Sequence, residues 1–257
     1  MALYFRLIWA GIRSRMQYKW DFLLSTLLYG VITAADFMTV AAILYRYKSV
    51  AGWNVWEVAV LSGMASSGYG LYRVFCSELD GFERYLVTGE FDNLLIRPWP
   101  TLASLLARNF DLGRVGAFCQ GLLILTLGLR GAGVQGWLRV YAYLVPVAGA
   151  CIIAALALIS AAAGFWVTRI NDLVTFMVNA PYAAANYPMD IFPRWLRRLF
   201  TVVLPVAAMG FIPMEYGLGK GGSPVALVVP FVAAGVALAV AYGAWRVGER
   251  RYQSSGS

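Results

Sequence analysis

Residues 77–111 of the chain read SELDGFERYLVTGEFDNLLIRPWPTLASLLARNFD, and the interpretation of the whole sequence starts from this stretch. It is the longest water-compatible interval in a sequence that is otherwise mostly apolar, and it holds six of the 13 carboxylates. Long apolar runs flank it at residues 56–76 and 112–129. We therefore expect a segment that folds outside a bilayer while both of its ends stay tethered to membrane-spanning helices.

The middle of this stretch, residues 89–97, has the pattern of a short amphipathic helix. Phe91, Leu94 and Leu95 recur at helical spacing and would share one face. Pro98 follows at a position that ends a helix. A short helix with an apolar face, held at the membrane surface between two spans, needs a partner surface.

The composition places the chain among integral membrane proteins. Of its 257 residues, 60% are hydrophobic and only 13% are charged, whereas about 25% of residues are charged in a soluble domain. The mean hydropathy is +0.66, and a single transmembrane domain over residues 1–257 is expected. The net charge of +8 follows from the excess of Lys and Arg on the cytoplasmic side of membrane proteins, so nucleic-acid binding is not expected.

The sequence lacks the residues that several kinds of catalysis and metal binding require. The sequence has no histidine, the commonest general base and metal ligand, and its three cysteines lie singly in apolar runs, which is neither a disulfide nor a metal pattern. The nearest match to an ATP-binding phosphate loop, GLGKG at residues 217–221, lacks the hydroxyl residue after the lysine and has Met214 where a glycine is required. We expect no catalytic residue and no metal site in this chain.

Apolar runs long enough to cross a bilayer predict an all-α fold with six transmembrane helices. A stripe of Phe5, Trp9, Ile12 and Met16 precedes them and predicts an interfacial helix over residues 1–20. The six runs are residues 21–45, 56–76, 112–129 and 138–167, a shorter run starting at residue 173, and residues 225–245.

Six spans place both termini on the same side of the membrane. With that side cytoplasmic, thirteen of the 21 Lys and Arg residues lie inside, as the positive-inside rule requires. We therefore expect cytoplasmic termini, a cytoplasmic segment at residues 77–111 and a location in the cytoplasmic (inner) membrane.

Prolines interrupt the interval between the fifth and sixth runs, residues 187–222, although it is still strongly apolar. Pro193 suits the first turn of a helix, and three arginines close behind it oppose crossing of the membrane. We expect a re-entrant helical hairpin at the outer mouth of a pathway; an extracellular loop with one surface helix is the alternative. The residues assigned to this outer gate are Pro188, Asp190, Pro193, Arg194, Arg197 and Arg198.

Polar side chains inside the runs are candidates for a pathway. Asp36 lies in the middle of the first run, where an ionised carboxylate costs about 2.5–3.5 kcal/mol, and Thr33 shares its face. A carboxylate satisfied by packing is the alternative for Asp36. The residues expected to line a pathway are Thr33, Asp36, Ser62, Ser66 and Tyr69.

Small residues recur at every fourth position in two of the runs. Gly235, Ala239 and Gly243 do so in the sixth run, and Ser160 and Gly164 in the fourth. This spacing lets helices approach closely. Packing within the subunit and contact with a second subunit both stay open, with the first expected.

Three segments carry a resemblance to a known family: GEFDNLLIRPWP at 89–100, LLARNFD at 105–111 and YPMDIFPRWLRRLF at 187–200. With the order of apolar runs, they make nearly the whole chain similar to ABC-2-type permeases, the membrane subunits of ABC exporters. More narrowly, the chain resembles a short subfamily loosely described as multidrug exporters. This resemblance implies an elbow helix over the first 20 residues, a coupling helix within residues 77–111 and a re-entrant segment at 187–222.

The resemblance also implies a function. The chain would be a permease that forms a substrate pathway with a second permease, identical or related, and ATP and Mg²⁺ would bind to separate ATPase subunits. The residues that would contact the ATPase are Glu90, Phe91, Asp92, Leu94, Leu95 and Arg97.

Two other functions compete with this one. A secondary transporter or channel-like subunit without an ATPase would need ionisable residues on several spans, where only Asp36 is central. A membrane-embedded lipid transferase would need converging carboxylates, for which the acids at residues 78–92 are the candidates. The transported substrate, the direction of transport and the identity of the second permease stay open.

Overall fold

The computed structural model describes four stretches of the chain and isolated residues between 24 and 49. The stretches are residues 51–96, 98–108, 114–167 and 169–252. Within them the chain consists of helices joined by short loops, with no strand. The interfacial helix expected over residues 1–20 lies outside the described residues, as does most of the first expected span.

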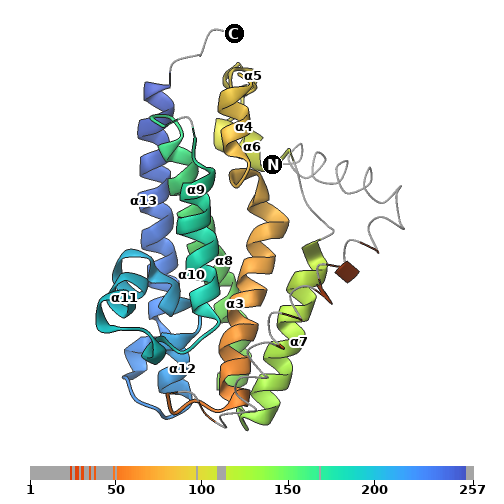
Figure 1. The fold of residues 1–257 in the computed structure, drawn as a ribbon, viewed down its shortest axis with the longest axis vertical. Coiled ribbons are helices and arrows are strands. Elements are labelled where there is room, and N and C mark those ends of the chain that lie inside the picture. Colours follow the sequence, from red (N-terminus) through yellow and green to blue (C-terminus); the bar gives the residue numbers. More distant parts are fainter. Residues whose placement is uncertain are drawn as a thin grey trace.

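Long helices run side by side and occupy the apolar runs expected from the sequence (Figure 1). They are α3 (Val55–Cys76), α7 (Val115–Gly131), α8 (Trp137–Ala163) and α13 (Val229–Arg251). A composite helix follows α8 and is made of α9 (Asn171–Val174), the π-helical η3 (Thr175–Asn179) and α10 (Ala180–Ala185). In the described part of the chain, α8 and α13 are long and apolar enough to cross a membrane by length and composition.

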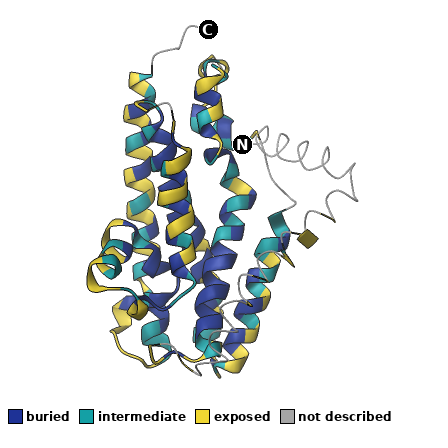
Figure 2. Cartoon of the chain, viewed as in Figure 1, coloured by how far each residue is buried: buried dark blue, intermediate teal, exposed yellow. Residues whose placement is uncertain are grey.

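α8 and α13 differ in what covers them. In the most apolar part of α8, 72% of the residues are buried, against 22% in α13. Figure 2 shows the same contrast, with exposed residues along much of α13. α8 is therefore the central helix, and α13 turns a large apolar surface away from the chain.

A capping box fixes the start of α3. The Asn54 side chain accepts hydrogen bonds from the backbone N–H groups of Trp56 and Glu57, each at 3.0 Å. The Glu57 carboxylate accepts a bond from the Asn54 N–H at 2.7 Å in return. This reciprocal pair satisfies N–H groups that the first turn of a helix leaves free.

Residues 77–108, the tethered segment, fold at the end of the bundle where α13 finishes (Figure 1). The segment holds η1 (Ser77–Leu79), α4 (Phe82–Val87), α5 (Asp92–Leu95) and α6 (Thr101–Leu106). The helix expected over residues 89–97 is thus a single turn. Because α5 ends at Leu95, the prediction that this helix ends before Pro98 is confirmed.

Residues 187–222, the proline-rich segment, cover the opposite half of the bundle (Figure 1). The segment holds η4 (Met189–Ile191), α11 (Arg194–Arg198), the π-helical η5 (Leu199–Val203), η6 (Pro205–Met209) and α12 (Phe211–Gly217), and η7 (Pro224–Leu227) leads on to α13. Pro193 precedes α11 as its N-cap, one position before the expected first turn. η6 is buried against α8, so the segment returns into the bundle after α11.

Glycines set the distance between α3 and α7, which make the most extensive helix contact in the described part of the chain. A Cβ added at Gly63 of α3 would lie 2.4 Å from the Leu125 backbone N, and one at Gly121 of α7 would lie 2.5 Å from the Ser67 backbone N. Such distances leave no room for a side chain. The two backbones are therefore in direct contact, as small residues permit in membrane helices.

The small residues that the sequence singled out behave differently. Gly235 and Gly243 of α13 have open space where a Cβ would be, with no atom within 4 Å. The expectation that they pack within the chain is therefore wrong for the described residues, because α13 turns this side outward. Gly164 does lie in contact, since an added Cβ would come 2.7 Å from Leu86 Cδ1.

We predict opposite effects for the same substitution at two helical glycines. Gly63→Ala forces α3 and α7 apart and lowers the free energy of unfolding by about 1–3 kcal/mol, as overpacking does. Gly235→Ala, the matched control, enters open space and raises stability by about 0.5–1 kcal/mol, because alanine favours the helix over glycine. Thermal unfolding of the purified chain in detergent measures both, and equal shifts would contradict the assigned contact.

Candidate functional site

A polar seam joins α3 to the composite helix. Ser62 Oγ donates to Asn186 Oδ1 at 2.9 Å, and Ser66 Oγ donates to the same oxygen at 3.4 Å. The Asn186 amide in turn donates to the Tyr182 carbonyl at 2.9 Å, which fixes its orientation. Two of the residues expected to line a pathway, Ser62 and Ser66, are thus buried and hydrogen-bonded inside the chain.

The seam continues toward the tethered segment through aromatic rings. Tyr69 stacks on Tyr182 with ring centroids 4.0 Å apart, and its hydroxyl donates to Asn179 Oδ1 at 3.1 Å. Asn179 is exposed and closes the π-helical turn η3, where the Ala180 N–H bonds to the Thr175 carbonyl. Pro181 follows and has no N–H for the α-helical pattern, which explains why the irregular turn lies here. Such turns are frequent at functional sites.

The polar spacing in the sequence indicated the α3 side of this seam, and the residues on the composite helix were not predicted. Asn179, Tyr182 and Asn186 repeat at spacings of three and four, the helical signal that also marked Ser62, Ser66 and Tyr69. The remaining pathway candidates, Thr33 and Asp36, lie outside the described residues.

An aromatic cluster anchors the tethered segment. Phe82 and Phe91 lie edge to face at 5.5 Å, Phe82 is 5.1 Å from Trp245, and Phe91 is 4.9 Å from Tyr252. Phe165, just after α8, is within 5.4 Å of Phe82 and 5.2 Å of Phe91. Phe82, Phe91 and Trp245 are fully buried. The cluster therefore joins the tethered segment to the ends of α8 and α13.

A carboxylate ties the same segment to the composite helix. Glu83 Oε2 accepts hydrogen bonds from the backbone N–H groups of Ile170, at 2.7 Å, and Asn171, at 2.9 Å. These groups open α9, where the helix dipole favours a negative charge. Glu83 therefore acts as a cap supplied from a distant part of the chain.

Two other carboxylates of the segment, Glu78 and Asp80, accept hydrogen bonds from side chains. Tyr85 donates to Glu78 at 2.6 Å, and burial together with this bond raises the pKa of Tyr85. Asp80 accepts from Tyr72 and pairs with Arg73, both on the last turns of α3. The tethered segment is thus fixed to the end of α3 as well.

The residues expected to contact an ATPase separate into two groups. Phe91 and Leu94 are fully buried within the chain, so the expectation that they present a free apolar face is wrong: both belong to the chain's own core, and aromatic rings surround Phe91. Glu90 pairs with Arg108 at 3.2 Å, and Asp92 lies against the Tyr252 hydroxyl, where burial and this contact raise the pKa of Tyr252.

Leu95, Ile96 and Trp99 of the tethered segment are exposed apolar residues, and we call them the tip. Leu95 is 42% exposed, Ile96 82% and Trp99 48%. Leu95 is one of the residues expected at this surface. Ile96 and Trp99 were not predicted, because they come after the helical turn α5 in the sequence and do not belong to its apolar face. Arg97, also expected here, lies outside the described residues.

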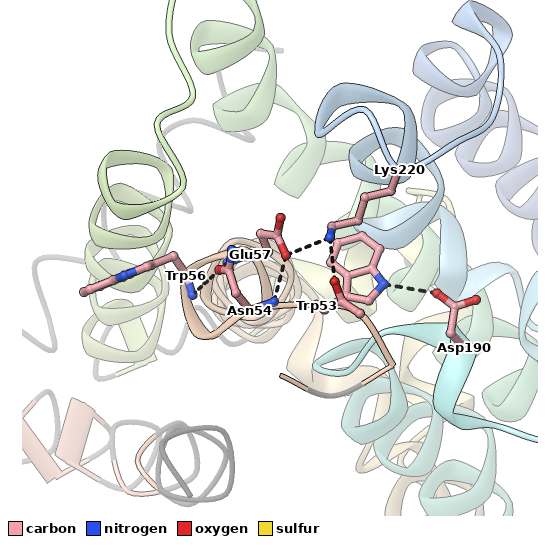
Figure 3. Close-up of polar contacts among 7 residues, drawn as sticks. Trp53, Asn54, Trp56, Glu57, Asp190 and Lys220 are labelled. Atoms are coloured by element: carbon pink, nitrogen blue, oxygen red, sulfur yellow. Dashed lines mark hydrogen bonds and ion pairs between the residues drawn. The ribbon is translucent and has the colours of Figure 1, made fainter. Parts of the chain in front are cut away.

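At the other end of the bundle a network ties α3 to the proline-rich segment (Figure 3). Trp53 Nε1 donates to Asp190 Oδ2 at 3.1 Å. Lys220 Nζ lies 2.9 Å from Glu57 Oε2, donates to the Gly52 carbonyl at 2.8 Å, and sits 5.0 Å above the Trp53 ring. The start of α3 is therefore held from two points of the segment.

Arg197 extends this network. Its guanidinium pairs with Asp190 at 2.7 Å, approaches Glu215 at 3.9 Å and lies over the Phe211 ring at 5.2 Å. Asp190 and Arg197, expected at an outer gate, thus lie in one network. Pro188 is buried, whereas Pro193, Arg194 and Arg198 are exposed.

The sequence did not identify Trp53, Glu57 and Lys220 as partners in this network. Lys220 contacts Gly52 across 168 positions and Trp53 contacts Asp190 across 137, and no local pattern indicates such pairs. Among the residues that the structure describes, no group of three His, Cys, Asp or Glu side chains could hold a metal ion.

In the described residues these features make a helical, strongly apolar bundle with polar networks at both ends. A family model described as ABC-2 family transporter protein matches residues 31–256, and the chain belongs to that family. The resemblance to ABC-2-type permeases seen in the sequence is thereby confirmed. A search of curated proteins finds no match.

We predict that the tethered segment depends on Glu83 and hardly on Glu90. Glu83→Ala removes the acceptor for two N–H groups at the start of α9 and lowers stability by about 1–2 kcal/mol, as loss of a helix cap does. Glu90→Ala breaks only a partly exposed ion pair and changes stability by less than about 0.5 kcal/mol. Thermal unfolding measures both, and an equal loss for Glu90→Ala would refute the ranking.

A double-mutant cycle tests the network of Figure 3. Because both side chains of the Glu57–Lys220 pair are mostly buried, at 14% and 23% exposure, we expect Glu57→Gln and Lys220→Met to couple by about 1–2 kcal/mol. Unfolding of the two single variants and the double variant gives this coupling energy. A value near zero would mean that the pair contributes nothing to holding α3.

Proposed function

We propose that the chain is the transmembrane permease subunit of an ABC exporter driven by a separate ATPase subunit. In this proposal, six helices span the cytoplasmic (inner) membrane, both termini and the tethered segment face the cytoplasm, and the proline-rich segment dips into the outer leaflet. Two permeases, identical or related, enclose the substrate pathway. ATP and Mg²⁺ bind only to the ATPase partner.

The tethered segment carries the proposal, because it is rigidly held on one side and apolar on the other. Its attachments reach α8 and α13 through the aromatic cluster, α9 through Glu83, α3 through Asp80 and the last turn of α13 through a bond from Thr101 to Glu249. Force applied at the exposed tip of Leu95, Ile96 and Trp99 would therefore be passed to all these helices together.

This arrangement suggests how ATP hydrolysis opens a path. Closure of the ATPase pair moves the tip, and the attached helices shift as one body. α3 runs from the tethered segment to the Trp53–Asp190 contact and the Glu57–Lys220 pair, so it links the motion to the outer end. The Tyr69–Asn179 part of the seam, where Asn179 is exposed, is the surface that we assign to the pathway.

The rival functions find less support. No carboxylate lies in the central turns of the long helices among the described residues, where an ion-coupled transporter would use one. The acids that a lipid transferase would use are engaged in separate structural contacts: Glu78 with Tyr85, Asp80 with Arg73, and Glu83 with α9.

Substitution of one exposed isoleucine at each end of the bundle tests the proposal. Ile96→Ser removes the most exposed residue of the tip and should weaken association with the ATPase at least about tenfold, as loss of a binding hot spot does. Ile191→Ser makes the same change in the proline-rich segment, where Ile191 is 40% exposed, and should leave association intact.

The full chain, purified from native membranes with its P-loop ATPase, provides the measurement through the amount of ATPase retained and its activity. Equal retention by both variants would remove the tip from the interface. Transport by the purified chain without any ATPase would refute the proposed function itself.

A further inference from the structure

An apolar groove lies between α13 and the proline-rich segment. Its volume is about 480 Å³, within the range of about 300–1,000 Å³ typical of small-molecule sites. Val202 and Val203 of η5 form one wall, and Val232, Val236 and Ala237 of α13 form the other. Val202, Val203, Val232 and Val236 are each more than half exposed, so the chain itself leaves the groove open.

The side chains that line the groove offer no free hydrogen-bond donor to an occupant. Its one hydroxyl belongs to Thr201, and that hydroxyl already donates to the Arg197 carbonyl at 2.7 Å. All the other lining side chains are aliphatic. The lining therefore matches a hydrocarbon occupant.

Two arginines precede one wall of this groove along the same helical segment. Residues four apart share a helix face, so the spacing of Arg194, Arg198 and Val202 places the two arginines of α11 in line with the valine of the wall. Both arginines are exposed, and neither makes an ion pair within the described part of the chain. Arg197 differs, because it turns inward to Asp190 and Glu215.

We propose that this groove binds an anionic phospholipid, with an acyl chain between η5 and α13 and the phosphate on Arg194 and Arg198. Guanidinium groups bind phosphate oxygens with two parallel hydrogen bonds, and an aliphatic channel beside them accepts the attached hydrocarbon. Neither half alone selects this ligand: a detergent tail fits the groove without the arginines, and free phosphate needs only the arginines. The site is separate from the seam and from the tip.

Native mass spectrometry of the purified full chain tests the site with defined lipids. The chain is exchanged into detergent containing equal amounts of phosphatidylglycerol and phosphatidylcholine, and the retained lipids are counted. We expect phosphatidylglycerol to be retained at least about tenfold over phosphatidylcholine. The double variant Arg194→Gln/Arg198→Gln should lose this preference, and Ala237→Trp, which fills the groove, should reduce retention of both lipids.

The matched control removes the same charge elsewhere. Arg130→Gln/Arg139→Gln changes two arginines at the ends of α7 and α8 and should keep the preference for phosphatidylglycerol. An equal loss in the control would assign the preference to net charge and overturn the proposal. Equal retention of the two lipids by the unmodified chain would also overturn it. So would a dimer mass that Ala237→Trp converts to monomer without any change in lipid, because a second copy would then cover the groove.

Discussion

The burial of Phe82 and Phe91 against Phe165 and Trp245 is the contact on which the rest of the arrangement depends. In the proposed topology these rings lie outside the bilayer, where the hydrophobic effect drives their association. Each aromatic pair adds about 0.5–1.5 kcal/mol beyond the burial itself. Together with the contacts of Glu83, Asp80 and Thr101, this cluster makes residues 77–108 a cap that belongs to the bundle.

Contacts along the helices rest on different physics. Lipid tails are as apolar as leucine, so helices inside a bilayer associate through close packing and interhelical hydrogen bonds. α3 makes both kinds of contact, on different sides. Gly63 packs closely against the backbone of α7, and Ser62 and Ser66 donate hydrogen bonds to Asn186, which follows α10. A helix held on both sides and tied at both ends has little freedom to bend. It is therefore suited to move as a unit.

The sequence predicted what depends on neighbours along the chain. Apolar runs indicated the long helices, and Pro98 indicated where the helix in residues 89–97 ends, because both signals are local. It did not predict which apolar residues the chain would cover. Phe91 and Ile96 look alike in the sequence, yet one is fully buried and the other 82% exposed. The difference lies in Phe165, Trp245 and Tyr252, which no periodicity brings to this place.

The two faces of α11 explain how such a short helix keeps its position. Five residues are too few to cross a bilayer, and three arginines among them oppose burial in hydrocarbon. On one face of α11, ion pairs with Asp190 and Glu215 compensate the charge of Arg197. Arg194 and Arg198 are exposed, and in the proposed arrangement water and lipid headgroups solvate them. In the proposed arrangement, the helix therefore lies at a depth where one face meets protein carboxylates and the other meets polar surroundings, while the exposed valines that follow it in η5 contact hydrocarbon.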